Sequence, residues 1–308
     1  MLLRASYWTW KIINGKKIPE AMPTGYFMLD GECAYNCSYC THARDSSSDS
    51  KFLSRISWKE IDVESLLNGL DNFKRLCFQV VNYNGAIADA KQLAKRVREK
   101  NKDIAISVST RILDKSDIDA FFEVGVSNLG IAIDVACSTL HKQYRGWTLD
   151  YTLELIQYGA QKYPGCITTH LIVGLGETDR DILRIFETMK SLGVEIALFA
   201  FTPVKGTKLE HAHMPSLERY RKIQILRYLM FDKDLTVHAE FNEHDNISKL
   251  IYDQTLGSTL DISHAFLTSG CKDCTRPFYN DKPGNGNELY NIHSISKTIP
   301  KAEENSKM

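Results

Sequence analysis

The sequence lacks long hydrophobic runs and an excess of either charge. No apolar stretch approaches the roughly 18 residues that a membrane span needs, so we expect no membrane association. Lysine plus arginine and aspartate plus glutamate each total 38, and the net charge is zero. Without a broad basic footprint, a nucleic-acid partner is not expected. The start, MLLRASYWTWKIINGKK, lacks an uninterrupted signal core, which predicts a cytoplasmic protein.

What the sequence does contain is a regular alternation of short apolar runs and longer helical patterns. The runs of strand length are 25–32, 75–81, 104–110, 129–134, 168–174 and 195–201. Helical patterns follow at 88–100, 115–124, 149–162 and 180–192. This order is typical of βα units around a parallel sheet and predicts an α/β fold, a full or partial (β/α) TIM-like barrel. A doubly wound open sheet is the alternative.

Composition divides the chain into four parts. We expect an N-terminal extension at 1–23, the barrel at 24–245, a C-terminal segment with cysteines at 246–285 and a flexible tail at 286–308. A helix at 216–231 and a strand at 235–241 are expected near the end of the barrel. The tail is assigned because its sequence is rich in Gly, Asn, Lys and Ser.

Three cysteines directly follow the first predicted strand. Cys33, Cys37 and Cys40 have the spacing C-x3-C-x2-C. Three thiolates on one loop can each hold one iron of a 4Fe-4S cluster and leave the fourth iron open for chemistry. A closed zinc site is the alternative, with His42 or a distant cysteine as the fourth ligand. We interpret the three cysteines as catalytic and metal-binding residues.

This spacing, with the aromatic Tyr39 before the last cysteine, resembles the signature of the radical S-adenosylmethionine (SAM) superfamily. The resemblance implies a barrel of that type and a 4Fe-4S cluster with SAM as cofactors. In that family SAM chelates the open iron, and one electron from the cluster cleaves it to a 5'-deoxyadenosyl radical. The protein's tasks are to orient SAM and to exclude water.

Candidate SAM contacts lie at the ends of later strands. Residues 172–177, IVGLGE, are similar to the family's G-x-I-x-G-x-x-E region, and their glycines let the backbone approach a ligand. A strand-terminal aspartate is suited to ribose hydroxyls but is equally typical of a helix cap. Ser107 and Ser109 alternate on one predicted strand, and Arg111 follows Ser109 by two residues. Contact with SAM and filling of barrel layers are equal interpretations of these three residues. The candidate cofactor-binding residues are Tyr39, Ser107, Ser109, Asp134, Ile172, Gly174, Glu177 and Val204.

The remaining cysteines suggest a second cluster. Alone, C-x-x-C at Cys271 and Cys274 is equally a redox pair, half a zinc knuckle or a chance spacing. Cys77 lies in the second predicted strand, where a thiol is either a ligand or a small hydrophobe. We interpret these three as ligands of an auxiliary iron-sulfur cluster, a 4Fe-4S cluster, with Cys137 as the candidate fourth ligand. A serine or the substrate as fourth ligand stays open, and Cys166 is expected to be structural.

Between residues 71 and 209 the order of features is similar to biotin synthase. Cys77, Asp134, residues 172–178 and residues 204–209 carry this resemblance. Biotin synthase holds an auxiliary 2Fe-2S cluster with three strand cysteines and an arginine. Of that set only Cys77 is present, because the third and fifth predicted strands carry Ser107, Ser109, Thr168 and Thr169 instead.

Over residues 24–285 the chain resembles the two-component lipoyl synthases, on residues 169–178 and 268–280. The resemblance implies sulfur insertion at carbon 6 or 8 of an octanoyl group on a carrier protein, of the lipoyl-domain or H-protein type. It also implies a sister radical SAM subunit and an external electron donor. Within those stretches we interpret His170 as a core histidine and Arg276 as a surface arginine. Another biotin synthase-like radical SAM enzyme and a zinc-stapled binding protein are the alternatives.

Overall fold

The computed structural model describes residues 2–18, 21–53, 56–252, 260–276 and 290–291. Apart from residues 290 and 291, the expected tail lies outside these ranges, as do residues 277–285 of the C-terminal segment. Among the described residues, no helix is long and apolar enough to cross a membrane.

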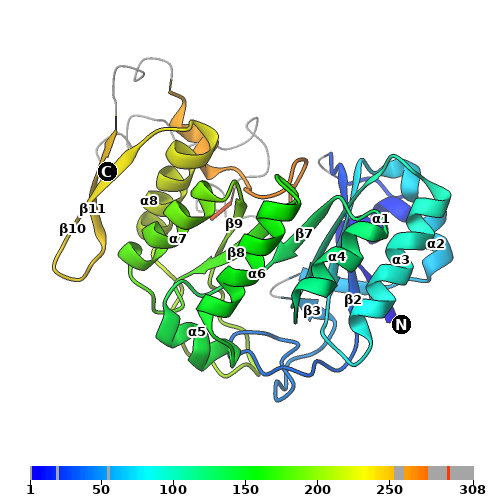
Figure 1. Cartoon of the computed structure of the whole chain (residues 1–308). Helices are drawn as coiled ribbons and strands as arrows, with labels where there is room; N and C mark the ends of the chain where they lie inside the picture. The colour runs from blue at the N-terminus through cyan, green and yellow to red at the C-terminus, as the bar shows by residue number, and fades with distance from the viewer. Residues whose placement is uncertain (1, 19–20, 54–55, 253–259, 277–289, 292–308) are drawn as a thin grey trace.

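Nine strands form one sheet in the order β3-β4-β1-β2-β5-β6-β7-β8-β9. From β2 to β9 the neighbouring strands are parallel and follow chain order (Figure 1). A doubly wound sheet reverses its order at a switch point, so this uninterrupted order confirms the barrel type. Its two edge strands, β3 and β9, do not pair with each other among the described residues, and the barrel is therefore partial. The strands are β1 Leu2–Ser6, β2 Thr24–Asp30, β3 Phe52–Leu53, β4 Ile56–Glu60, β5 Arg75–Val80, β6 Ala105–Thr110, β7 Asn128–Ile131, β8 Ile167–Val173 and β9 Glu195–Ala200.

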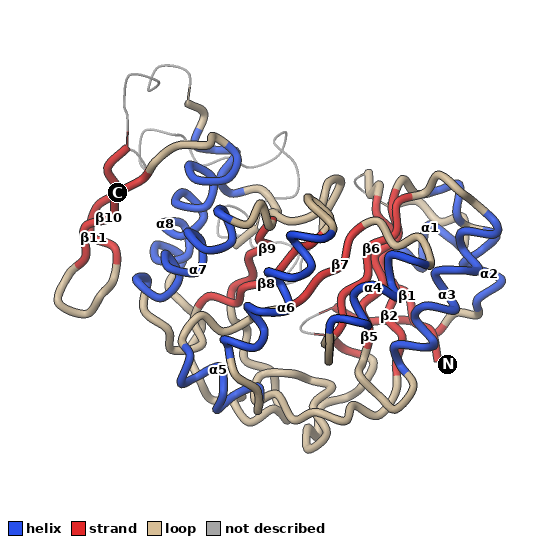
Figure 2. The backbone as a smooth tube through the Cα atoms, in the orientation of Figure 1, coloured by secondary structure: helices blue, strands red, loops and turns tan. Residues whose placement is uncertain are grey.

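Helices cover the outer side of the curved sheet (Figure 2). They pack through apolar positions three and four residues apart; α3, for example, buries Ala86, Ala90, Leu93, Ala94 and Val97. The α8 helix continues as a π-helical turn at Tyr228–Asp232. The helices are α1 Tyr7–Ile13, α2 Val63–Asn68, α3 Ala86–Lys100, α4 Lys115–Glu123, α5 Ser138–Arg145, α6 Leu149–Lys162, α7 Asp179–Ser191 and α8 Leu217–Arg227.

Two expected boundaries differ from the structure. The N-terminal extension contributes β1, which pairs antiparallel with both β2 and β4 and so belongs to the main sheet. The expected strand 235–241 is β10, Val237–Phe241, and it pairs with β11, Ile247–Tyr252, in a separate hairpin. The expected boundary at 245/246 therefore falls inside this hairpin. Pairing partners decide these boundaries, and the composition of the segments does not reveal them.

Candidate active site

One cavity of about 320 Å³ lies in the barrel and is lined by both groups of cysteines. The loop after β2 contributes Cys33, Cys37 and Cys40. Cys77 enters from β5, and the C-terminal segment contributes Cys271 and Cys274. Six of the cysteines that the sequence singles out thus face one space, although up to 241 positions separate them.

The strand register stacks the lining side chains in layers. Thr24 pairs with Arg75 at the start of β2 and β5. Two residues further along, Tyr26, Cys77 and Ser107 are neighbours on β2, β5 and β6, and their side chains share one face. The next layer contains Met28, Gln79 and Ser109. Because the strands are parallel, the first layer marks one end of the barrel and the loops after the strands mark the other.

The loop with Cys33, Cys37 and Cys40 lies at the carboxyl ends of the strands and is held by several neighbours. The amide of Ala34 donates to the carbonyl of Asn82 (2.8 Å), and that of Ser38 donates to the carbonyl of Tyr144 (2.9 Å). Seven residues after Cys40, the amide of Ser47 donates to the carbonyl of Gly206 (3.0 Å). The loops after β5 and β9 and the helix α5 therefore fix the position of the cysteine loop.

Asp134 connects this loop to the end of β7. Its Oδ2 accepts a hydrogen bond of 2.6 Å from the Tyr39 hydroxyl and forms an ion pair with Nη1 of Arg145. Asp134 has a φ of +58° and an isolated bridge to Leu171, and the residue that caps α5 is Cys137. The interpretation of Asp134 as a helix cap is therefore wrong. Its carboxylate lines the cavity and holds Tyr39 in place.

The C-terminal segment approaches the opposite end of the barrel, at the first residues of the strands. Nε of Arg75 donates to the carbonyl of Lys272 (2.9 Å), and the Thr24 hydroxyl donates to the carbonyl of Asp273 (2.8 Å). The Tyr26 oxygen accepts from the amides of Thr275 and Arg276 (2.8 and 2.9 Å). Barrel side chains thus hold the backbone around Cys271 and Cys274.

Cys77, Cys271 and Cys274 form the second group. Sγ of Cys274 lies 3.5 Å from the Tyr26 oxygen, and Sγ of Cys271 lies 3.7 Å from Oγ of Ser107. Cys137, expected as the fourth ligand, does not line the cavity, because it is the N-cap of α5. Cys166 also lies away from the cavity, where its thiol is 3.6 Å from the carbonyl oxygen of Pro164.

Burial raises the pKa of individual cysteines in each group, Cys37 and Cys40 in the first and Cys77 and Cys271 in the second. Burial raises the pKa of Cys40 to about 12, and Cys37 and Cys33 add to the shift. Burial also raises the pKa of Cys37, which Arg145 and Arg111 lower. In the second group burial raises the pKa of Cys77, and Cys274 and Cys271 raise it further. Without a metal these side chains are neutral thiols, so metal binding must displace their protons.

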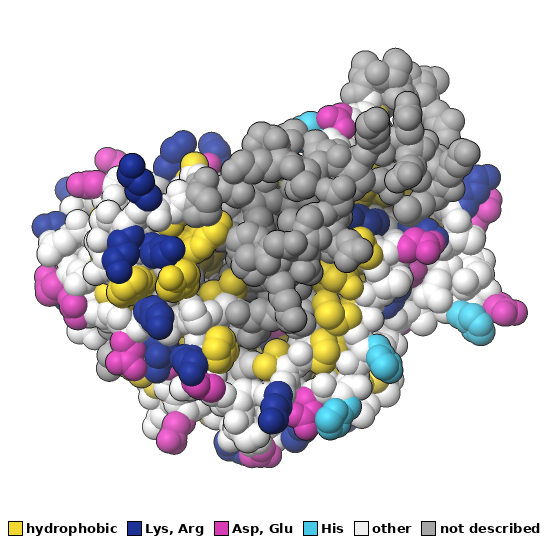
Figure 3. Space-filling view, turned by 180° about the vertical axis from the view of Figure 1, so that it is seen from behind, with side chains coloured by type: hydrophobic (Ala, Val, Ile, Leu, Met, Phe, Trp, Pro, Cys, Tyr) yellow, Lys and Arg dark blue, Asp and Glu magenta, His cyan; other side chains and the backbone are white. Residues whose placement is uncertain are grey.

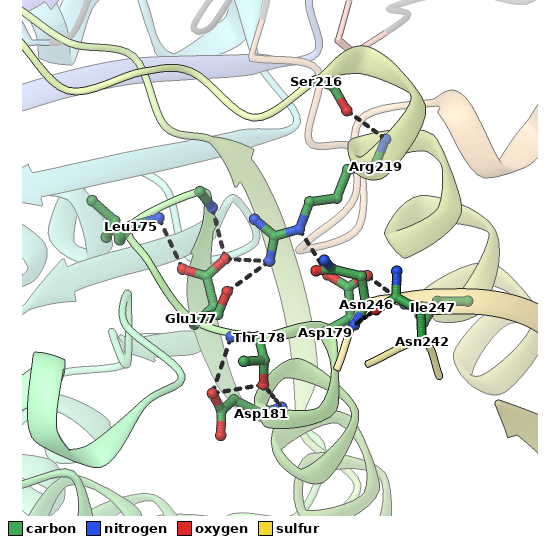
Figure 4. A network of polar contacts seen from close by, with 11 residues as sticks. Leu175, Glu177, Thr178, Asp179, Asp181, Ser216, Arg219, Asn242, Asn246 and Ile247 are labelled. Carbon is green, nitrogen blue, oxygen red and sulfur yellow. Dashed lines mark hydrogen bonds and ion pairs between the residues drawn. The ribbon is translucent and has the colours of Figure 1, made fainter. Parts of the chain in front are cut away.

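The glycine-containing loop after β8 is held by a buried ion-pair network (Figure 4). Both oxygens of Glu177 accept backbone hydrogen bonds, from Gly174 and Leu175 (2.8 Å each), and Arg219 donates to Oε1 at 3.0 Å. Burial raises the pKa of Glu177, whereas Arg219 lowers it. Glu177 and Gly174 do not line the cavity, so their expected role as direct SAM contacts is not supported. Ile172, in the same stretch, does line it.

The other candidate cofactor-binding residues all line the cavity: Tyr39, Ser107, Ser109, Asp134, Ile172 and Val204. Arg276 lines it too and is only 6% exposed, so its interpretation as a surface arginine is wrong. Its guanidinium lies 4.0 Å from the centre of the Phe199 ring. His170 faces the same cavity, and burial lowers its pKa to about 4, which keeps the imidazole neutral.

Among the lining residues that sequence reasoning did not single out are Tyr26, Arg75 and Arg145. Alternation along a strand was a usable signal for Arg75, since residues i and i+2 share a face and Cys77 was already expected to point inward. Arg111 lies over the rings of Tyr35 and Trp147, at 4.0 and 5.3 Å. Arg111 was expected near SAM because it follows Ser109 by two residues, and it does line the cavity.

The donor sets fit iron-sulfur clusters better than a single ion. In each group the thiols influence one another's pKa and line the same wall. Among the described residues, no three His, Cys, Asp or Glu side chains are close enough together to hold one metal ion. In a cluster each thiolate binds a different iron, so the thiolates can lie further apart than the ligands of a single ion. Cys33, Cys37 and Cys40 would hold one cluster, and Cys77, Cys271 and Cys274 are available for another.

The face opposite to that of Figure 1 shows hydrophobic side chains gathered near its middle, beside atoms that are not described (Figure 3). Lysine, arginine and acidic side chains are spread around its margins (Figure 3). This mixed surface fits the zero net charge.

The fold and the site define a partial-barrel enzyme with a cysteine loop at the carboxyl ends of its strands. The family model of the radical SAM superfamily matches residues 31–189, more than half of the chain. The chain therefore belongs to the radical SAM superfamily, whose members use a 4Fe-4S cluster with SAM.

Curated relatives place the sequence near one branch of this superfamily. The chain is 22% identical over 244 residues to a biotin synthase of Clostridium tetani, with 78% of this chain and 74% of the relative covered. It is 20% identical over 256 residues to a biotin synthase of Parabacteroides distasonis, with 78% of each chain covered. The protein is thus biotin synthase-like in sequence.

Solved structures agree with the fold. Methylornithine synthase matches with a TM-score of 0.55 and 16% identity, covering 73% of this chain and 67% of its own. HydG, a maturase of the [FeFe]-hydrogenase, matches with a TM-score of 0.57 and 13% identity, covering 72% and 52%. These likenesses concern the fold alone.

Proposed function

We propose that this protein inserts sulfur into a protein-bound octanoyl chain, as one half of a two-component lipoyl synthase. Its partners are then an octanoylated carrier protein of the lipoyl-domain or H-protein type, a sister radical SAM subunit and an external electron donor. The auxiliary cluster of the proposal uses Cys77, Cys271 and Cys274. The observation that carries the proposal is that this second group lines the same cavity as Cys33, Cys37 and Cys40.

A shared cavity suits sulfur insertion for a physical reason. A carbon radical must meet sulfur before it meets solvent or another hydrogen donor. The two cysteine groups lie toward opposite ends of the barrel, one on the loop after β2 and the other beside the first residues of the strands. A substrate carbon between them faces both. The similarity to biotin synthases also supports a sulfur-inserting enzyme.

When bound, SAM and the two clusters would supply a hydrogen-abstracting radical and a sulfide. The protein's own side chains position these groups and exclude water. Tyr39, Asp134 and Arg145 hold the cysteine loop against the barrel. Glu177 and Arg219 fix the backbone that leads to Ile172 in the cavity wall. Met28, Ile172, Phe199 and Phe201 give the wall an apolar surface, which favours an alkyl chain.

The test is an anaerobic reaction of the protein with SAM, a reductant and an octanoyl-lysine peptide, with and without the sister subunit. Mass spectrometry should find a peptide that has gained one sulfur together with 5'-deoxyadenosine. A variant with Cys271→Ala and Cys274→Ala is the matched control, which should cleave SAM without transferring sulfur. Unchanged peptide in every reaction, with SAM cleaved, would contradict the octanoyl substrate and favour another biotin synthase-like radical SAM enzyme.

A further inference from the structure

Arg75 is a buried cation with neutral partners. It is 7% exposed and begins β5, two residues before Cys77. Its Nε donates to the carbonyl of Lys272 at 2.9 Å, and its Nη1 donates to Oγ of Ser107 and Oδ1 of Asn128, both at 2.7 Å. Within the described parts of the chain, no carboxylate forms an ion pair with it.

Two other buried arginines, Arg145 and Arg227, and the partly buried Arg219 do pair with carboxylates. Arg145 pairs with Asp134, Arg219 pairs with Glu177 and Asp179, and Arg227 pairs with Glu195 and Asp232. A buried guanidinium without an opposite charge costs several kcal/mol, so buried cations are normally paired. An anion is therefore expected beside Arg75.

The cysteines around it would become anions as the thiolates of a bound cluster. Cys77 lies on the same face of β5 as Arg75, because side chains two residues apart on a strand share a face. Lys272, whose carbonyl Arg75 binds, directly follows Cys271, and Ser107 contacts both Arg75 and Cys271.

We propose that Arg75 is a positioning residue that supplies the counter-charge of an anionic iron-sulfur cluster on Cys77, Cys271 and Cys274 and raises its reduction potential. This inference rests on the auxiliary cluster of the proposed function. Three thiolates bring three negative charges, which the core of a cluster offsets only in part. A buried cation favours the more negative, reduced state and so raises the potential.

The guanidinium has a second task. Its Nε holds the loop that carries Cys271 and Cys274, while its Nη1 holds β6 and β7 through Ser107 and Asn128. Removal of Arg75 should therefore weaken retention of the cluster as well as change its potential. Loss of such an outer-shell contact typically costs about tenfold or more in metal affinity.

The experiment uses a parent with Cys33, Cys37 and Cys40 all changed to Ala, so that any cluster is the auxiliary one. Its reduction potential is measured by an anaerobic titration monitored by electron paramagnetic resonance. Arg75→Met should shift the potential to a lower value and speed the loss of iron to a chelator about tenfold. Arg75→Lys keeps the charge and should restore most of the potential.

Asn128→Asp is the second variant, because it keeps Arg75 and the volume of the side chain. The new carboxylate occupies the position that is 2.7 Å from Nη1 of Arg75 and should neutralise it locally, which again lowers the potential. Arg98→Met is the control. Arg98 also donates to neutral groups, the carbonyl of Gly125 and Oγ of Ser127 among them, but does not line the cavity. Its loss should leave the potential unchanged.

The outcomes separate this inference from the proposed function. A parent that binds no iron would overturn both. A parent with a cluster whose potential is the same in Arg75→Met and Asn128→Asp would overturn the role of Arg75 alone. A shift in Arg75→Met that Arg75→Lys does not reverse would show that hydrogen-bond geometry, and not charge, is responsible. If Arg75→Met does not fold by circular dichroism, Asn128→Asp decides the question.

Discussion

The hydroxyl of Tyr39 donates a 2.6 Å hydrogen bond to Asp134, and this contact joins the cysteine loop to the end of β7. Tyr39 immediately precedes Cys40, so the bond holds a cluster ligand at a set distance from the barrel wall. Burial raises the pKa of Tyr39, and the phenol therefore remains a donor throughout the ordinary pH range.

Tyr39→Phe should lower both stability and SAM cleavage. The change removes a hydrogen bond to a charged group, which costs about 1.5–3 kcal/mol, and leaves Asp134 with Arg145 alone. Anaerobic urea unfolding and the rate of 5'-deoxyadenosine formation measure the two effects. Tyr151→Phe, at an exposed tyrosine on α6, is the control and should change neither. Wild-type cleavage in Tyr39→Phe would show that the bond does not position the loop.

The two cysteine groups should be separable by their iron. Replacing Cys33, Cys37 and Cys40 by Ala should abolish SAM cleavage and leave the iron and sulfide of the second group. Replacing Cys77, Cys271 and Cys274 should do the reverse. Iron and sulfide assays with a SAM cleavage assay measure both, and Cys166→Ala, outside the cavity, should resemble the wild type. Equal loss of all iron in both variants would argue against two independent sites.

Glu177→Gln should destabilise the fold and weaken SAM binding indirectly. The substitution keeps the shape of the side chain but removes the negative charge beside Arg219 and two charge-assisted backbone bonds, a loss of about 2 kcal/mol or more. Thermal unfolding measures stability, and equilibrium dialysis measures SAM affinity. Glu187→Gln, on the exposed side of α7, the helix that follows Glu177, is the control. A Glu177→Gln protein as stable as the control would contradict the network.

Stability should fall in mild acid because of His141. This histidine is fully buried, Nδ1 lies 2.9 Å from the carbonyl oxygen of Trp147, and burial lowers its pKa from 6.5 to about 4. Between these values the unfolded chain binds a proton that the folded protein does not, so stability is lost as the pH falls. The loss is at most about 3 kcal/mol.

To test this prediction, the free energy of unfolding in urea is measured at several pH values for His141→Gln and for the parent. The variant should lose less stability than the parent as the pH falls from about 6.5 to about 4. His244→Gln is the control, since that imidazole is 75% exposed. Parallel curves for His141→Gln and the parent would refute the assignment.

The first cysteine group was predictable because it is local. A strand, a loop and three cysteines within eight positions need no tertiary information, and the structure places all three thiols on one cavity. The βα alternation was predictable for a similar reason, since periodicity of side chains reflects local backbone geometry. The strands then pair in the order in which they occur in the chain, which gives the predicted partial barrel.

The second group shows where sequence reasoning stops. Cys77 and the C-x-x-C were expected to meet, and they do, but Cys137 was added only because it follows a strand. The chain turns at Asp134, where φ is +58°, and begins α5 at the residue after Cys137. Short-range position along the chain did not reveal that Cys137 points elsewhere.

The sequence by itself determined the superfamily, the alternation of strands and helices and the cysteines to be tested as iron ligands. Only the tertiary structure decided that Arg75 and Arg276 are buried, that Glu177 supports a loop and that the C-terminal cysteines approach the barrel from the end opposite the first group. The physical reason is that motifs and periodicity arise from neighbours within a few residues. Burial and counter-charge arise from contacts between residues as far apart as 250 positions.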